Sequence, residues 1–213
     1  MVQLMFKDYG IQKKQVLFTI ALLIGLITLW HTTGTPIEMM YLVGGLVFSL
    51  SLVTGGLGYD EENGVTKFLL TLPVERKDIV VAKYTTGLLS VLLGTVMTFV
   101  LVEALNLIVD SIDTPPWTLI FGSVMGNLVA IALILAVYYK FGNKNIRYIY
   151  VGFILLAVGG IFLYNLTDIE VAIMQWISDF NQLVLIMVSI LITLIIYFIS
   201  LLWSMRVMAR KEL

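Results

Sequence analysis

Long uninterrupted apolar stretches constrain this chain more than any other feature of its sequence. A helix that crosses the hydrocarbon core of a bilayer needs roughly 20 predominantly apolar residues. Six stretches come close to this length, and the shortest are the first and the fifth. They span residues 16–30, 39–57, 84–109, 117–138, 149–166 and 183–203. None of them alternates apolar and polar residues as the strands of a membrane barrel do. The sequence therefore predicts an all-α, polytopic membrane protein with six transmembrane helices.

The composition supports this prediction. Of the 213 residues, 60% are hydrophobic and only 13% are charged, whereas a soluble domain is typically about 45–50% apolar and about 25% charged. Such a chain lacks the polar residues needed to cover a water-soluble core. This composition therefore argues against a soluble enzyme, a disordered chain and a nucleic-acid-binding protein.

The charged residues predict how the chain is oriented. All 13 lysines and arginines lie in residues 1–15, the loop 58–83, the loop after residue 138 and the tail 204–213. The loops between these segments carry only acidic charges, at Glu38, Asp110, Asp113, Asp168, Glu170 and Asp179. Because basic loops remain on the cytoplasmic side of a membrane, both termini are predicted to be cytoplasmic. We expect a single transmembrane domain, 1–213, in a cell membrane.

The first 15 residues do not resemble a membrane span or a cleavable signal peptide. Phe6 and Tyr9 can enter the bilayer interface while Lys7, Lys13 and Lys14 face the lipid headgroups. This pattern favours a short amphipathic helix lying on the inner leaflet. A frayed basic tail is the alternative.

The cytoplasmic loop 58–83 has a more elaborate pattern. An acidic turn over residues 59–64 ends in Asn63-Gly64, which is a turn signal. A short helix over 65–72 follows, with Phe68, Leu69 and Leu72 on one face, and Pro73 ends it. A further helix begins near Glu75 and continues into the third span. The apolar face suits either docking to another protein or packing on the chain's own helix ends.

The sequence offers little material for catalysis. It has no GxxxxGK[ST] phosphate loop, no cysteine and one histidine, His31. We therefore expect no catalytic residues, no metal site and no cofactor in this chain. Glu61-Glu62 resembles the glutamate pair of some intramembrane proteases, but it lies in the loop without partner histidines.

One ionisable residue, Glu103, lies within a predicted span, where a carboxylate is costly. Asn106 shares its helical face, and Asn127 of the next span is a possible hydrogen-bonding partner. The group is either part of a translocation path or a structural clasp between helices. Small residues also form stripes on the second, third and fourth spans, which favours close helix packing.

The loop after the second span resembles a known family. Residues 59–63 and 68–84 are similar to permeases of the ABC-2 type exporters, and to a small six-span bacterial subfamily in particular. The segment from Leu72 to Tyr84 reads LPV-x-R-x-x-I-V-x-x-K-Y. Glu75 departs from the small capping residue expected there, although an acidic residue still suits a helix N-terminus.

The resemblance implies a role for this loop as a coupling helix that docks on a separate ATPase subunit. Phe68, Leu69, Leu72 and Pro73 would form the docking face, with Arg76 and Lys77 as nearby polar contacts. ATP and Mg would be bound by that partner, and two permease copies or homologues would enclose the substrate path.

The implied cargo is an amphipathic or antimicrobial peptide or a drug, as in the phenol-soluble modulin exporters of staphylococci. A non-transporting scaffold or sensor subunit, or a secondary transporter, is the alternative function.

Overall fold

The computed structural model describes residues 13–32, 37–65, 68, 75–109, 117–142, 152 and 182–210. These residues form five long helices and contain no strand. The helices are α2 (Lys13–Thr32), α3 (Ile37–Glu62), α5 (Arg76–Val109), α6 (Trp117–Phe141) and α9 (Gln182–Arg210). The predicted all-helical fold class is therefore confirmed.

All five helices are long and apolar enough to cross a membrane. The shortest, α2, has 20 residues, which corresponds to about 30 Å at 1.5 Å per residue and matches a bilayer core. Five of the six predicted spans lie within these helices. The predicted interfacial helix with Phe6 and Tyr9, and the predicted fifth span over 149–166, fall outside the described residues.

The boundary of the second span differs from the prediction. Residues 59–62 were expected in a turn, but they form the last turn of α3. The helix ends only where the Asn63 backbone N–H and the Asn63 side-chain amide both donate to the Tyr59 carbonyl. Gly64 then adopts a positive φ of 61°, which a glycine accepts without strain. The predicted Asn63-Gly64 turn is thus present, one helical turn beyond the apolar stretch.

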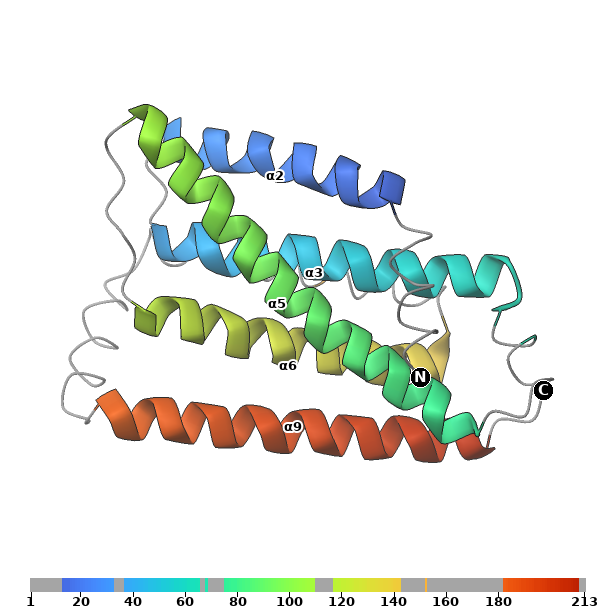
Figure 1. Cartoon of the computed structure of the whole chain (residues 1–213). Coiled ribbons are helices and arrows are strands. Elements are labelled where there is room, and N and C mark those ends of the chain that lie inside the picture. Colours follow the sequence, from blue (N-terminus) through green and yellow to red (C-terminus); the bar gives the residue numbers. More distant parts are fainter. Residues whose placement is uncertain are drawn as a thin grey trace.

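The helices run up and down along a common direction (Figure 1). We call the end with the last turns of α3, α6 and α9 and the first turns of α2 and α5 the basic end. The described lysines and arginines lie in the helix turns at this end: Lys13, Lys14, Arg76, Lys77, Lys83, Lys140, Arg206 and Arg210. For the described residues, the predicted separation of charge is therefore present in the fold.

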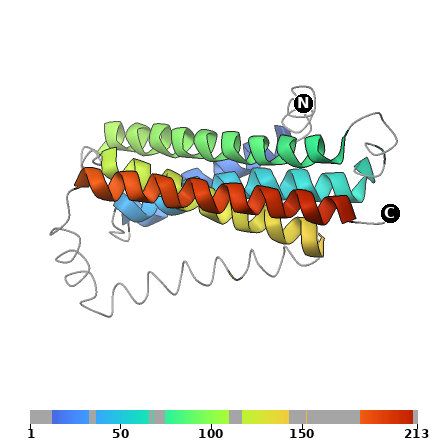
Figure 2. The same ribbon diagram turned by 90° about the horizontal axis from the view of Figure 1, so that it is seen from below.

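Helix α5 crosses obliquely over α3, α6 and α9, and the view from below confirms that it lies on one side of that row (Figures 1 and 2). Helices α6 and α9 both end at the basic end, so they are parallel neighbours.

Apolar packing is strongest towards the basic end. One buried cluster draws on α3, α5, α6 and α9 and includes Leu50, Leu57, Val80, Val91, Ile131, Leu135, Tyr139 and Met208. The outward faces of α2 and α9 instead expose large apolar side chains such as Phe18, Met187 and Phe198. A water-soluble protein rarely exposes continuous apolar surfaces of this kind, which suit contact with lipid.

Candidate functional site

The candidate site lies at the basic end, around the connection from α3 to α5. Phe68, the described member of the predicted docking face, is 63% exposed. Its backbone N–H donates to the Gly64 carbonyl at 3.1 Å, which is the helical i→i−4 pattern. The other predicted docking residues, Leu69, Leu72 and Pro73, fall outside the described residues. Their role stays a prediction.

The helix after this connection begins at Arg76, as the sequence predicts. Glu75, just before it, accepts a hydrogen bond at its carbonyl from the Asp78 N–H, at 2.9 Å. The acidic Asp78 in the first turn is favourable because the helix dipole is positive there. Lys77 is exposed to solvent.

Arg76 contacts the chain's own bundle. Its guanidinium donates to the Met208 carbonyl at 3.3 Å and approaches the Ala209 carbonyl at 3.5 Å. These carbonyls belong to the last turn of α9, where a cation is favoured by the helix dipole. Arg76 therefore joins the start of α5 to the end of α9. Its contact with an ATPase stays a prediction.

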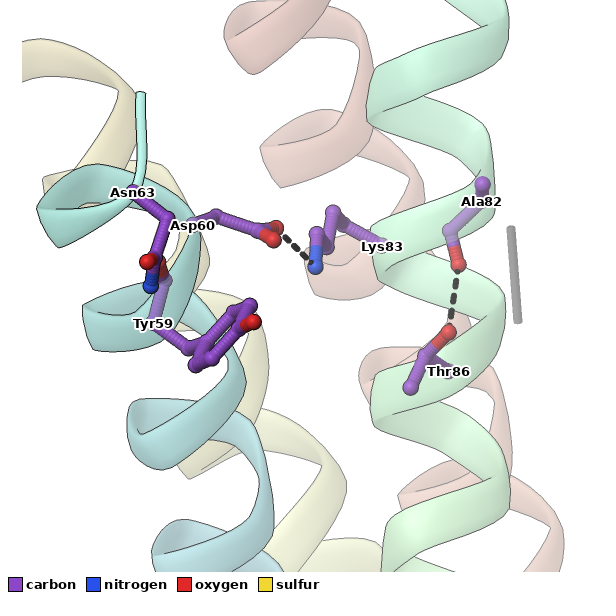
Figure 3. A network of polar contacts seen from close by, with 6 residues as sticks. All are labelled: Tyr59, Asp60, Asn63, Ala82, Lys83 and Thr86. Carbon is purple, nitrogen blue, oxygen red and sulfur yellow. Dashed lines mark hydrogen bonds and ion pairs between the residues drawn. The ribbon is translucent and has the colours of Figure 1, made fainter. Parts of the chain in front are cut away.

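A buried ion pair connects α3 and α5 beside this site. The Lys83 ammonium lies 2.5 Å from Asp60 Oδ2, and Figure 3 shows the two side chains reaching toward each other between the helices. The side chains are only 13% and 4% exposed. An acidic residue in the last turn of a helix is disfavoured by the dipole, so Lys83 offsets an otherwise costly charge.

The sequence analysis did not find this pair, because it assigned Asp60 to an exposed acidic turn. The sequence feature that could have revealed the pair is an acidic residue at the inner end of the second span and a basic residue at the inner end of the third. A small cavity of about 10 Å³, roughly what one water molecule requires, lies next to Lys83. Gly56, Thr86 and Leu135 line it from α3, α5 and α6.

Tyr84, the next residue, anchors α5 to α9 and α6. Its hydroxyl lies 2.6 Å from Ser200 Oγ and 2.8 Å from Ser204 Oγ. Ser200 Oγ is also 2.6 Å from the Ala132 carbonyl, to which only the serine can donate. Because each hydroxyl has one proton to donate, the order is Ser204 to Tyr84, Tyr84 to Ser200, and Ser200 to Ala132.

Tyr197 completes this polar network. Its hydroxyl donates to the Tyr84 backbone carbonyl at 2.5 Å, and the two rings meet edge to face at 5.4 Å. Helices α5, α6 and α9 are thus joined by hydrogen bonds in the half of the bundle nearest the candidate site.

The polar residues predicted to form a group on the third and fourth spans lie further from the basic end. Glu103 and Asn106 are half-buried on α5, and Asn127 is 1% exposed on α6. Among the described residues, Asn127 Nδ2 has no hydrogen-bond partner. A carboxylate can only accept, so the expected bond from this amide to Glu103 is not formed in the structure. Asn127 packs instead against Gly45 of α3.

The small residues of the second and third spans do meet, as predicted. A Cβ placed on Gly94 of α5 would lie 2.8 Å from the Gly45 carbonyl oxygen of α3, and one placed on Gly44 would lie 2.8 Å from Thr98. The two backbones can approach this closely only because side chains are missing there. A Cβ placed on Gly122 of α6, by contrast, would meet no other described residue within 4 Å beyond its own helix turns.

Comparison with known proteins identifies the class of membrane protein. A family model described as "ABC-2 family transporter protein" matches residues 3–209, nearly the whole chain. The chain therefore belongs to the ABC-2 family, and it is a membrane permease of the ABC transporter type rather than the ATPase. No curated protein matches the chain. No solved structure matches it either.

Proposed function

We propose that the chain is the membrane-spanning subunit of an ATP-driven exporter. In this role, a separate ATPase subunit binds ATP and Mg and docks on the segment between α3 and α5. Two permease copies or homologues and two ATPases form the working unit. The observation that carries the proposal is the family match over residues 3–209.

The structure supports the place of docking. The connection from α3 to α5 leaves the bundle at the basic end, which the positive-inside rule assigns to the cytoplasm, where ATP is found. Phe68 is exposed there, and an apolar side chain in such a position suits insertion into a groove of a partner. The helices on both sides of the connection are anchored by Asp60, Lys83 and Arg76.

The proposed cargo is an amphipathic peptide, an antimicrobial peptide or a drug. Long apolar helices with a sparse polar group, Glu103 with Asn106 and Asn127, suit a substrate that is itself partly apolar. We propose these three residues as part of the translocation path. A scaffold or sensor subunit is the competing function, and it predicts no stable ATPase partner.

Co-purification tests the docking. The chain is co-expressed with a phosphate-loop ATPase sought among the products of neighbouring genes, and the complex is captured through the permease. We expect Leu69→Asp with Leu72→Asp to abolish capture, because two buried charges at a docking face are strongly unfavourable. Tyr59→Asp with Ala209→Asp is the matched control, since it adds the same charges at exposed positions of the same end. Normal capture by the Leu69/Leu72 variant would contradict the docking proposal.

ATP hydrolysis by the reconstituted complex tests the cargo. In nanodiscs, an amphipathic peptide should raise the hydrolysis rate, whereas a scrambled peptide of equal charge without an apolar face should not. Equal rates with both peptides would contradict the peptide class and leave the docking result unaffected.

A further inference from the structure

We infer that Asp60 and Lys83 are positioning residues for energy coupling: their ion pair makes the end of α3 follow the start of α5 when the ATPase moves the intervening segment. The inference rests on the proposed function, because it gives these residues a role in the coupling that the function requires. Neither residue is part of the predicted docking face.

The location of the pair supports this role. Asp60 lies in the last turn of α3 and Lys83 lies two turns into α5, so the pair joins the two helices near the ends that the segment 63–75 connects in sequence. A force applied to that segment reaches α3 and α5 at these turns first. A contact here decides whether the two helices move together or slide past each other.

Fold stability alone does not explain an ion pair at this position. Both side chains are nearly buried, and burial removes most of the water that would solvate the charges. For buried ion pairs in general, well-packed apolar residues of similar volume are often equally stabilising or better. What an ion pair adds is a directional contact that fixes which turn of one helix faces which turn of the other.

A small cavity interrupts the apolar packing beneath the pair. The cavity of about 10 Å³ beside Lys83 lies between α3, α5 and α6, next to Gly56, which contributes no side chain to fill it. The ion pair therefore joins the two helices beside a gap in their side-chain packing.

The other connections of α5 show why α3 needs a contact of its own. Arg76 joins α5 to α9, and Tyr84 joins it to α9 and, through Ser200, to α6. These hydrogen bonds carry a movement of α5 into α6 and α9. The Asp60–Lys83 pair links α5 to α3 at this end.

Distance measurements in the assembled complex test the inference. The chain has no cysteine, so Glu62→Cys at the end of α3 and Thr85→Cys on α5, both exposed, provide two sites for spin labels. An excess of unlabelled permease in the complex ensures that the measured distance lies within one copy. The permease–ATPase complex is measured in nanodiscs without nucleotide and after trapping with ATP and vanadate. For the native ion pair, we expect one distance that is the same in both states.

The informative variant is Asp60→Leu with Lys83→Met, which replaces the pair by apolar side chains and avoids an isolated buried charge. We expect this double variant to fold and to bind the ATPase, but to show a second, shifted distance after trapping. A charge exchange, Asp60→Lys with Lys83→Asp, should restore the single distance. A merely stabilising pair would change the unfolding temperature and leave the trapped distance unchanged.

Two results would overturn the inference, and they are distinguishable. If the wild-type chain captures no ATPase, the proposed function fails and the coupling role fails with it. If the ATPase is captured but the double variant keeps the single distance after trapping, only the role of Asp60 and Lys83 is refuted.

Discussion

The two ends of the bundle differ in whether their buried polar groups have hydrogen-bond partners. At the basic end, the Tyr84 hydroxyl lies within hydrogen-bond distance of two serines, and Lys83 pairs with Asp60. Towards the other end, the Tyr41 hydroxyl and the Asn127 amide nitrogen are buried and have no hydrogen-bond partner among the described residues. Both tyrosines are almost completely buried, yet only one is anchored by its hydroxyl.

This difference indicates which part of the bundle is fixed and which part is free to rearrange. A satisfied polar network defines a single arrangement of its helices, because breaking it leaves buried donors and acceptors unpaired. Tyr41 and Asn127 contribute no such bond through their hydroxyl and amide nitrogen among the described residues, so their helices can separate there without breaking a hydrogen bond of these two groups. In an exporter, the fixed end is the one expected to receive force from the ATPase.

The largest loss of stability is expected when one member of the ion pair is replaced. Lys83→Met leaves the Asp60 carboxylate buried without its cation, and such a change typically destabilises a protein by about 3–5 kcal/mol. Thermal unfolding of the purified chain in detergent measures it. The double variant Asp60→Leu with Lys83→Met should recover most of the loss. An unchanged unfolding temperature for Lys83→Met would show that the basic end is not held by this pair.

Gly94→Ala is expected to have the next largest effect. The new Cβ would lie 2.8 Å from the backbone oxygen of Gly45, and a backbone atom cannot move aside as a side chain can. Overpacking of this kind costs about 1–3 kcal/mol, measured again as a lower unfolding temperature. Gly122→Ala is the control, because the space around Gly122 is open; alanine there should be neutral or slightly stabilising.

Tyr84→Phe sharpens the comparison at the basic end. The variant removes one hydroxyl and leaves Ser204 without its acceptor and Ser200 without its donor. We expect a loss of about 1–3 kcal/mol, since unpaired buried polar groups cost this much. Ser204→Ala, which removes one bond of the network and leaves Tyr84 bonded to Ser200, should have a smaller effect on the unfolding temperature.

Tyr41→Phe is the matched change towards the other end, and we expect it to have the smallest effect on the unfolding temperature. The hydroxyl that it removes has no partner among the described residues, so the unfolding temperature should stay the same or rise. A loss as large as that of Tyr84→Phe would mean that Tyr41 has a partner after all, and the contrast between the two ends would disappear.

Much of the fold could be predicted from the sequence, because membrane spans depend on composition and length. Five predicted spans lie within helices, and α5 begins at Arg76 inside the basic loop as expected. The end of α3 was misjudged at residues 59–62, because a run of charges resembles an exposed turn. Asp60 can be buried because α5 places Lys83 beside it, and the pattern of the loop alone does not show this contact.

The hydrogen-bond partners could not be predicted for the same reason. Tyr84, Ser200 and Ala132 are far apart in the sequence, and generic helix positions give no sign of their contact. The predicted bond from Asn127 to Glu103 also depended on a helix rotation that local pattern does not determine. The stripes of small residues predicted packing more successfully, because a missing side chain favours close approach whatever the partner.

The central claim is that a separate ATPase docks on the segment after α3, and site-directed crosslinking tests it most directly. In the cysteine-free chain, a photoactivatable label is attached to Phe68→Cys, at the basic end. The reference is Met187→Cys, which is at least as exposed as Phe68 but lies in α9 near the opposite end. We predict that the ATPase crosslinks to the label at position 68 and not to the one at 187. Equal crosslinking at both positions, or crosslinking at 187 alone, would contradict the account.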